Sequence, residues 1–185
     1  YKRLPVRGKG QGISLRDKAM HYKILTLMTT SNVILILATF VLLACNSNRV
    51  YETHQSSFSN YRWEKTNVLT FKPEILDTAQ TYRVYLALRH VYGFQFQNFT
   101  TKVTMTSPSG IVTNKTFTFP VIGSDMKYLS VCDGDYCDLE TVMEESMKFN
   151  ELGAYHYTVE HLMPVPEVPN VMEFGLIIEK HEVKK

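Results

Sequence analysis

The sequence lacks the short motifs on which many catalytic and metal sites depend. It has no His-Glu-x-x-His, no Cys-x-x-Cys pair, no Gly-x-Ser-x-Gly elbow and no glycine-rich phosphate loop. His156 and His161 have opposite parity in one predicted strand, so their side chains are expected on different faces. These absences argue against the common hydrolase and zinc-enzyme designs, and we expect a protein without enzymatic activity and without a cofactor.

Clusters of basic residues are also missing after residue 44. Residues 45–185 carry 13 Lys and Arg against 17 Asp and Glu, a net charge of −4, although the whole chain has a charge of +2. Because nucleic-acid binding needs a basic surface, we expect no nucleic-acid partner. The sequence shows no internal repeat, and its length suits one domain with one hydrophobic core.

Cysteine is scarce, with three in the chain, and the first of them ends an apolar run. Leu42-Leu43-Ala44-Cys45 follows the apolar segment 33–41, and Lys23 lies in a short basic region before it. This order is typical of a bacterial lipoprotein signal. The thiol of Cys45 would receive a diacylglyceryl group, and the leader would be cut off before Cys45. We therefore predict lipidation at Cys45 and attachment to a membrane through acyl chains such as palmitate.

This interpretation divides the chain into four parts. Residues 1–19 precede Met20 and are interpreted as upstream sequence or a mis-annotated start. The lipoprotein signal peptide is then 20–44, the lipidated tether is 45–50, and a single β-sandwich domain occupies 51–185.

An uncleaved signal anchor is the alternative to a lipoprotein signal. A membrane-spanning helix needs roughly 20 apolar residues. The segment 25–44 is long enough only if the polar run Thr29-Thr30-Ser31-Asn32 lies inside the helix. The strongly apolar part, 33–44, has signal-peptide length, so we favour the lipoprotein signal.

The other two cysteines flank an acidic segment. Cys132 and Cys137 are five positions apart and would close a small disulfide loop in an oxidising compartment, the alternative being two free thiols. Asp133, Asp135 and Asp138 are weak candidate calcium ligands, because calcium binds several oxygens of a flexible loop. Their spacing does not match an EF-hand, so we favour a solvated acidic loop and predict no metal site.

Alternation of apolar and polar residues predicts that most of the domain consists of strands. The expected strands are 81–91, 99–105, 111–119, 154–161 and 172–178. Segment 81–91 is apolar on both faces, which indicates a central strand. Ser107-Pro108-Ser109-Gly110 supplies a turn that joins two strands as a hairpin.

One segment departs from alternation. Leu139, Val142, Met143 and Met147 recur at three- and four-residue spacing, which predicts a short helix. Many short strands with turns between them otherwise favour an all-β fold. We predict an antiparallel β-sandwich, immunoglobulin-like or jelly-roll-like, with one short helix.

Two apolar features have alternative interpretations. The proline-rich segment 163–169 is either a stiff connection between the last strands or an exposed apolar edge for a partner, and we favour the connection. Tyr92, Phe94 and Phe96 are either core residues at a strand end or an aromatic platform for a sugar, and we favour the core. Trp63 is also predicted in the core.

Four segments resemble the gliding motility lipoprotein GldH family of Bacteroidetes. They are 45–52, 82–90, 153–163 and 174–180, the last with the sequence Phe174-Gly175-Leu176-Ile177-Ile178-Glu179-Lys180. The resemblance implies a cell-envelope lipoprotein of the outer membrane, on its periplasmic face or at the cell surface. It also implies a non-catalytic scaffold or assembly factor that works with other gliding lipoproteins and type IX secretion components.

Two further expectations concern the envelope setting. Asp77-Thr78-Ala79 resembles the short site at which Bacteroidetes O-glycosylate exported proteins, so Thr78 is a candidate O-glycosylation site. A carbohydrate- or peptidoglycan-binding envelope lipoprotein is the alternative function, since β-sandwiches often carry sugar sites.

Overall fold

The described part of the chain is built from short and long strands. The structure is a computed structural model, and it describes residues 48–181. Cys45 and the predicted signal peptide lie outside these residues. The elements are β1 (Arg49–Gln55), η1 (Ser59–Tyr61), β2 (Arg62–Glu64), β3 (Leu69–Phe71), β4 (Glu74–Ile75), β5 (Tyr82–Val91), β6 (Asn98–Thr106), β7 (Val112–Pro120), β8 (Val131–Asp133), β9 (Tyr136–Met147), β10 (Gly153–Ala154), β11 (His156–His161), β12 (Glu167–Pro169) and β13 (Val171–Lys180).

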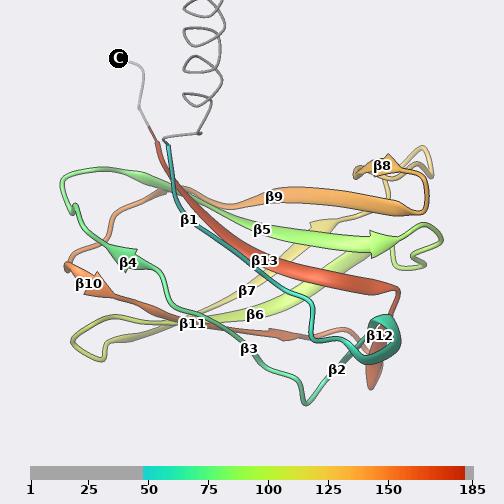
Figure 1. Cartoon of the computed structure of the whole chain (residues 1–185), viewed down its shortest axis with the longest axis horizontal. Helices are drawn as coiled ribbons and strands as arrows, with labels where there is room; N and C mark the ends of the chain where they lie inside the picture. Colours follow the sequence, from blue (N-terminus) through green and yellow to red (C-terminus); the bar gives the residue numbers. More distant parts are fainter. Residues whose placement is uncertain (1–47, 182–185) are drawn as a thin grey trace, which may run out of the picture. The chain divides into compact units, whose positions relative to one another are not determined.

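The longer strands form two antiparallel sheets that face each other (Figure 1). The larger sheet has the order β1-β13-β5-β9-β8, and the smaller has the order β3-β11-β6-β7. Two further pairs, β4 with β10 and β2 with β12, lie beside them. The predicted antiparallel β-sandwich is therefore confirmed. The predicted central strand is also confirmed, because β5 lies between β13 and β9.

The core lies between the inner faces of the two sheets. Alternate residues of β5 and β13 point inward and are buried, as the period of two in a strand requires. They are Tyr82, Val84, Leu86, Leu88 and His90 of β5, and Phe174, Leu176 and Ile178 of β13. Trp63 packs among the rings of Phe58, Phe99 and Phe174, and its indole N–H donates to the carbonyl of Asn67 at 2.8 Å.

The predicted helix at 139–147 is wrong, because this segment forms β9. Leu139 and Met143 are buried on one side, whereas Val142 is exposed. A spacing of four residues puts two side chains on the same face in a strand as well as in a helix, so the pattern did not distinguish them. Pairing with β5 decides the matter, although two register shifts interrupt it between Tyr82 and Tyr85. Within residues 48–181 no helix has the length and apolar character needed to cross a membrane.

The proline-rich segment after β11 is part of the core boundary. Met163 and Val168 are buried, and Val168 pairs directly with Trp63 where β12 meets β2. The alternative of an exposed apolar edge for a partner is therefore wrong. Pro166 precedes β12 and Pro169 is its last residue, so prolines limit this ladder at one end of the core to three residues on each strand.

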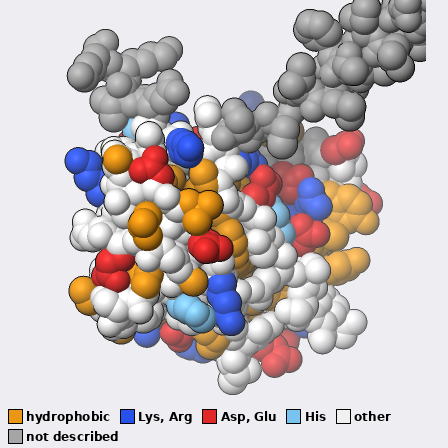
Figure 2. Space-filling view, turned by 60° about the vertical axis from the view of Figure 1, so that its left-hand side comes forward, with side chains coloured by type: hydrophobic (Ala, Val, Ile, Leu, Met, Phe, Trp, Pro, Cys, Tyr) orange, Lys and Arg blue, Asp and Glu red, His pale blue; other side chains and the backbone are white. Residues whose placement is uncertain are grey.

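Several large hydrophobic side chains are exposed on the described surface. Figure 2 brings forward the left-hand side of Figure 1, and hydrophobic side chains there are interspersed with charged ones. Exposed apolar residues are common on soluble domains when they are scattered in this way.

The aromatic cluster gives a direct test of the core. Trp63→Ala should lower the free energy of unfolding by about 3–5 kcal/mol, because it removes a large buried ring that contacts three other rings. The exposed Ile111→Ala is the matched control and should change it by less than about 0.5 kcal/mol. Urea unfolding monitored by far-UV circular dichroism, which reports on the strands and not on the indole of Trp63, measures the free energy of unfolding of both variants. Equal changes in the free energy of unfolding for Trp63→Ala and Ile111→Ala would contradict the position of Trp63 in the core.

Candidate functional site

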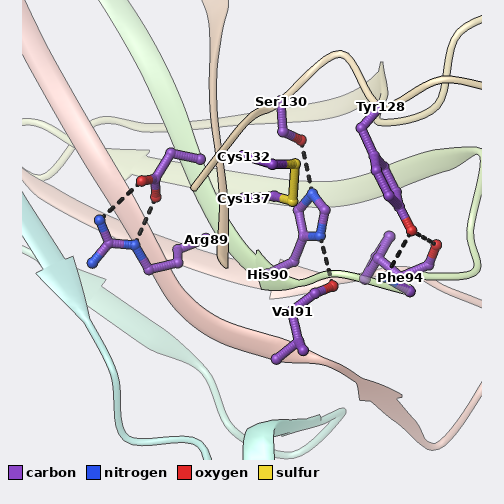
Figure 3. Close-up of a disulfide and its surroundings, with 10 residues drawn as sticks. Arg89, His90, Val91, Phe94, Tyr128, Ser130, Cys132 and Cys137 are labelled. Atoms are coloured by element: carbon purple, nitrogen blue, oxygen red, sulfur yellow. Dashed lines mark hydrogen bonds and ion pairs between the residues drawn. A yellow bond between two sulfur atoms is a disulfide. The ribbon is translucent and has the colours of Figure 1, made fainter. Parts of the chain in front are cut away.

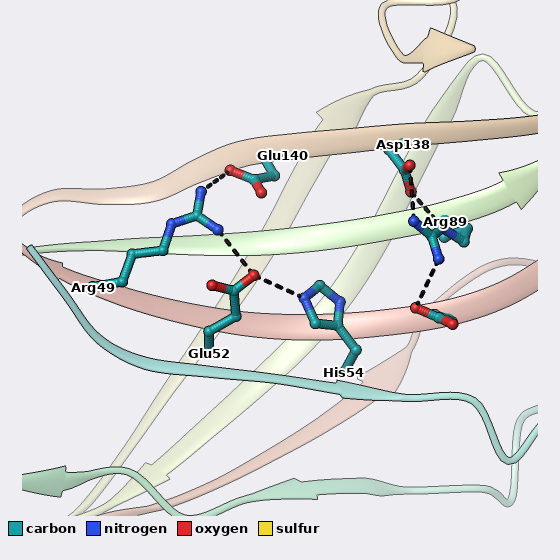
Figure 4. Close-up of polar contacts among 7 residues, drawn as sticks. Arg49, Glu52, His54, Arg89, Asp138 and Glu140 are labelled. Atoms are coloured by element: carbon teal, nitrogen blue, oxygen red, sulfur yellow. Dashed lines mark hydrogen bonds and ion pairs between the residues drawn. The ribbon is translucent and has the colours of Figure 1, made fainter. Parts of the chain in front are cut away.

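The outer face of the five-stranded sheet carries a row of charged side chains. In β5 the outward residues are Arg83, Tyr85, Ala87 and Arg89, because the alternate positions point into the core. Their neighbours on β1, β9 and β13 supply carboxylates, and the two kinds of side chain form ion pairs across this face (Figure 4). An apolar outer face, which the sequence of segment 81–91 suggested, is therefore wrong: only Ala87 is buried there, and Arg83, Tyr85 and Arg89 are half-buried.

One group of contacts is centred on Arg49 at the start of β1. Its Nη2 donates to Glu140 Oε2 of β9 at 2.8 Å, and its Nη1 lies 2.9 Å from Glu52 Oε1. Glu52 also lies 3.4 Å from His54 Nε2. The hydrogen bond from Arg49 lowers the pKa of Glu52 below its ordinary value, and the contact with His54 adds to this effect. The group therefore joins the edge strand β1 to β9 across two intervening strands.

A second group is centred on Arg89 at the other end of the face. Its Nε and Nη2 donate to the two carboxylate oxygens of Asp138 at 2.6 and 3.0 Å, which is a bidentate pair. Its Nη1 lies 3.5 Å from Glu173 Oε2 of β13. The hydrogen bonds to Asp138 raise the pKa of Arg89 above its ordinary value. Arg89 thereby ties β5 to both of its neighbours.

A hollow of about 320 Å³ lies between the two groups. Ala87 of β5 lines the hollow, and its short side chain leaves space at the centre of the face. Its partner Gly175 of β13 is covered by the imidazole of His54. A Cβ atom at Gly175 would come within 2.5 Å of Nδ1 of His54, so a larger residue here would displace the imidazole. Carboxylates outnumber guanidinium groups around the hollow, and the face therefore favours cationic over anionic groups.

The two remaining cysteines lie at the end of the sheet. Cys132 of β8 and Cys137 of β9 stand opposite each other and form a disulfide (Figure 3). The segment between them is a tight hairpin, in which Gly134 has φ of 59°, a conformation that glycine adopts without steric cost. The predicted acidic loop is therefore a two-stranded turn that holds β8 against β9.

A buried histidine holds the loops that meet this hairpin. His90 contacts the carbonyl of Val91 through Nδ1 at 3.0 Å and the hydroxyl of Ser130 through Nε2 at 2.7 Å (Figure 3). The hydroxyl of Tyr128 donates to the carbonyl of Phe94 at 3.0 Å. Burial lowers the pKa of His90 below its ordinary value. These contacts fix residues 91–94 and 128–130 against the end of the core.

The three aromatic residues after β5 do not share one environment. Phe94 is 2 % exposed and Phe96 packs partly against the core, whereas Tyr92 is 63 % exposed. The predicted core position is therefore confirmed for Phe94 and Phe96 and wrong for Tyr92. Tyr92 lies edge-on to Tyr128 at 5.3 Å between ring centroids. A platform of three exposed rings for a sugar is not formed.

The other predicted site residues have separate surroundings. Asp133, Asp135 and Asp138 do not gather, since no group of three possible ligands close enough for a metal ion exists in residues 48–181. Thr78 is exposed, and the preceding Asp77 accepts the backbone N–H of Ala79 at 2.8 Å. O-glycosylation of Thr78 stays a prediction. Cys45 is outside the described residues, so its lipidation also stays a prediction.

The sequence did not single out the charged face as a unit. Its residues come from four strands that are far apart in the chain, and their meeting depends on the order β1-β13-β5-β9. One local signal was present, since Arg83 and Arg89 share one parity in β5 and Glu173 and Glu179 share one parity in β13. That parity indicates two charged rows but not that they are adjacent.

Comparison with known proteins identifies the family. A family model described as GldH lipoprotein matches residues 49–178, which is nearly all of the described sandwich. The chain belongs to the GldH lipoprotein family. The resemblance found in the sequence is thereby confirmed.

Two relatives of the GldH family are informative. The chain is 21% identical over 159 residues to a gliding motility lipoprotein GldH homolog of Christiangramia forsetii, covering 82% of this chain and 96% of that protein. It is 28% identical over 116 residues to the gliding motility lipoprotein GldH of Flavobacterium johnsoniae, covering 63% of this chain and 72% of that protein. The match therefore extends over most of the length of both relatives.

Solved structures give a weaker comparison. The dimeric latent PorU of Porphyromonas gingivalis aligns with 75% of this GldH-family chain and with 13% of its own chain, at 12% identity and a TM-score of 0.30. A similarity at this level is not a basis for inferring a shared function.

The buried histidines predict how stability depends on pH. Burial lowers the pKa of His90, and burial together with the charge of Lys65 lowers the pKa of His161. Both stay neutral in the folded chain at pH values where the unfolded chain takes up protons, below about pH 6.5. The stability that comes from keeping both histidines neutral is therefore complete above about pH 6.5. It is lost as the pH falls from there toward the pKa of each histidine in the folded chain. Over that range the free energy of unfolding falls by up to about 1.4 kcal/mol per pH unit for each histidine.

Unfolding free energies between pH 5 and pH 7.5 test this expectation. His161→Gln should reduce the slope, because a glutamine does not titrate and so takes up no proton in the unfolded chain. The exposed His156→Gln is the control and should leave the slope as in the wild type. Identical slopes in all three proteins would contradict the assignment of His161.

Proposed function

We propose that this chain is a gliding motility lipoprotein of the cell envelope, attached to the outer membrane through acyl chains on Cys45. In this proposal it is a non-catalytic scaffold or assembly factor for the gliding and type IX secretion machinery. The observation that carries the proposal is the family match, which spans the sandwich from β1 to β13. The names of the two relatives, both gliding motility lipoproteins, support the same function.

The start of the sandwich supports close attachment to a membrane. β1 begins at Arg49, and the carbonyl of Asn48 accepts the backbone N–H of Lys180 at 2.7 Å. The chain is thus held by the fold from Asn48 onward, three positions after Cys45. An extended chain covers at most about 3.6 Å per residue, so acyl chains on Cys45 would keep the domain within about 11 Å of the membrane surface. Since one acyl chain gives only marginal binding, the several chains of a lipoprotein matter for stable attachment.

The charged outer face supports a scaffold. Its arginines and glutamates are paired with one another across neighbouring strands, and exposed pairs of this kind contribute less than about 1 kcal/mol each. Their exchange for pairs with a partner therefore costs little. A face with charges of both signs can give orientation and specificity to an interface, as electrostatic complementarity does in other complexes.

Substitution of the lipidated residue tests the proposal. Cys45→Ala in the chromosomal gene should move the protein out of the membrane fraction and abolish gliding, because the thiol that receives the diacylglyceryl group is lost. Ser47→Ala changes a neighbouring residue and leaves the thiol in place, so it should retain both attachment and gliding.

The same strains test the partners. Wild-type protein recovered from solubilised envelopes should carry other gliding lipoproteins or type IX secretion components. Normal gliding of the Cys45→Ala strain, or recovery of the wild type without any such component, would contradict the proposal.

A further inference from the structure

A small hollow lies at the end of the sandwich where the chain enters the fold. The carbonyl of Asn48 accepts the backbone N–H of Lys180 at 2.7 Å, which joins the entry of the chain to the end of β13. Lys180 also lines a hollow of about 130 Å³, which we call the entry hollow. Its lining residues are Val50, Glu74, Ile75, Leu76, Asp77, Tyr82 and Lys180. The entry hollow therefore adjoins the part of the domain that is nearest to Cys45 along the chain.

Two apolar side chains of the entry hollow are open to the outside. Leu76 is 80 % exposed and Val50 is 38 % exposed. Leu76 directly follows β4, in which Ile75 is buried, so alternation turns Leu76 away from the core. A single exposed leucine is common on soluble domains and does not by itself indicate a partner. The position of Leu76 beside the chain entry decides what it can contact.

The entry hollow carries charges of both signs. Lys180, Glu74 and Asp77 form no ion pairs within residues 48–181. The carboxylate of Asp77 accepts the backbone N–H of Ala79 at 2.8 Å, whereas Lys180 and Glu74 are exposed. A surface that carries a positive and a negative charge side by side is complementary to this arrangement. The headgroup of a zwitterionic phospholipid has this character, since it joins a phosphate to an ammonium group.

The length of the tether limits what can reach the entry hollow. Asn48 is three positions after Cys45, and an extended chain covers at most about 3.6 Å per residue. Acyl chains on Cys45 would therefore keep Asn48 within about 11 Å of the membrane surface. A helix is about 10 Å across and two packed sheets lie about 10 Å apart, so a folded partner has little room between this end and the bilayer. The spacing favours the lipid surface itself as the occupant.

We propose that the entry hollow rests on a zwitterionic phospholipid surface, with Leu76 in the headgroup layer and Lys180 beside a lipid phosphate. Glu74 then faces the ammonium groups of the same lipids. The proposal deepens the proposed function and rests on it, because it needs acyl chains on Cys45. It adds an orientation, in which the entry hollow faces the membrane and the hairpin of β8 and β9 faces away from it.

The contact orients the domain, and the acyl chains hold it. Membrane binding by a protein surface scales with the apolar area that it buries and with its electrostatic attraction to the lipids. One exposed leucine and one lysine supply little of either, so they do not replace the lipid anchor. Once the anchor holds this end close to the bilayer, however, the same two side chains decide which way the sandwich turns.

Fluorescence quenching by spin-labelled lipids tests this orientation. Leu76→Cys and Val131→Cys are each purified as the acylated protein from cell envelopes, and the new thiol is labelled with a small fluorophore. Cys132 and Cys137 do not compete for the label, because they form a disulfide. The labelled proteins are reconstituted in vesicles of phosphatidylethanolamine and phosphatidylcholine, with or without a lipid that carries a nitroxide on its headgroup.

The probe at position 76 should lose emission when the nitroxide lipid is present, because it lies in the headgroup layer. The probe at position 131 should keep its emission. Val131 is the matched control, since it is also 80 % exposed and lies in β8, at the far end of the larger sheet from the start of β1 (Figure 1). The ten residues of β5 run between these two ends and span roughly 33 Å.

Three results would overturn the proposal. They are an unquenched probe at position 76, which is expected if a protein or a second copy of the chain covers the entry hollow, equal quenching of the two probes, and quenching at position 131 alone. Lys180→Glu in the Leu76→Cys protein should reduce the loss of emission, because its carboxylate is repelled by lipid phosphate. An unchanged loss would contradict the position of Lys180 beside a phosphate.

Flotation of the vesicles separates this proposal from the proposed function. Acylated protein floats with the vesicles whichever way the sandwich is turned, so flotation without quenching at position 76 overturns only the orientation. Protein from envelopes that does not float lacks the acyl chains and contradicts the proposed attachment.

Discussion

The packing of one sheet on the other around Trp63, Phe99 and Phe174 is the interaction on which the rest of the structure depends. Each long strand can bury only its inward residues, so its outward residues are left for other uses. On the larger sheet they form ion pairs centred on Arg49 and Arg89. The packing of the core therefore determines which charged side chains meet on the outer face of the larger sheet, although these side chains are not part of the core.

The two long sides of the sandwich differ. On one side Gln55 of β1 donates to the carbonyl of Thr70 of β3, and the backbone N–H of Lys72, next to β3, donates to the hydroxyl of Tyr51. On the other side residues 139–147 of β9 have no neighbouring strand beyond β5 within residues 48–181. Two register shifts interrupt their pairing with β5, and such irregularities are one way in which proteins blunt an open strand edge.

Alternation predicted β5, the β6–β7 hairpin, β11 and β13 from the sequence, because one face of each strand is buried and the period of two is clear. It failed at β9, where Leu139 and Met143 fit a helix and a strand equally well and only pairing with β5 selects the strand. The disulfide partners Cys132 and Cys137 were predictable from their spacing. The charged face was not predictable, since it is formed by strands that are distant in the sequence and adjacent only after folding.

The central claim is that a sandwich of the GldH family works while attached to a membrane through acyl chains on Cys45. Intact-mass spectrometry of the protein isolated from cell envelopes tests this claim most directly. The account predicts a chain that begins at Cys45 and carries the added mass of a diacylglyceryl group. An unmodified chain that begins at residue 20 would contradict the account.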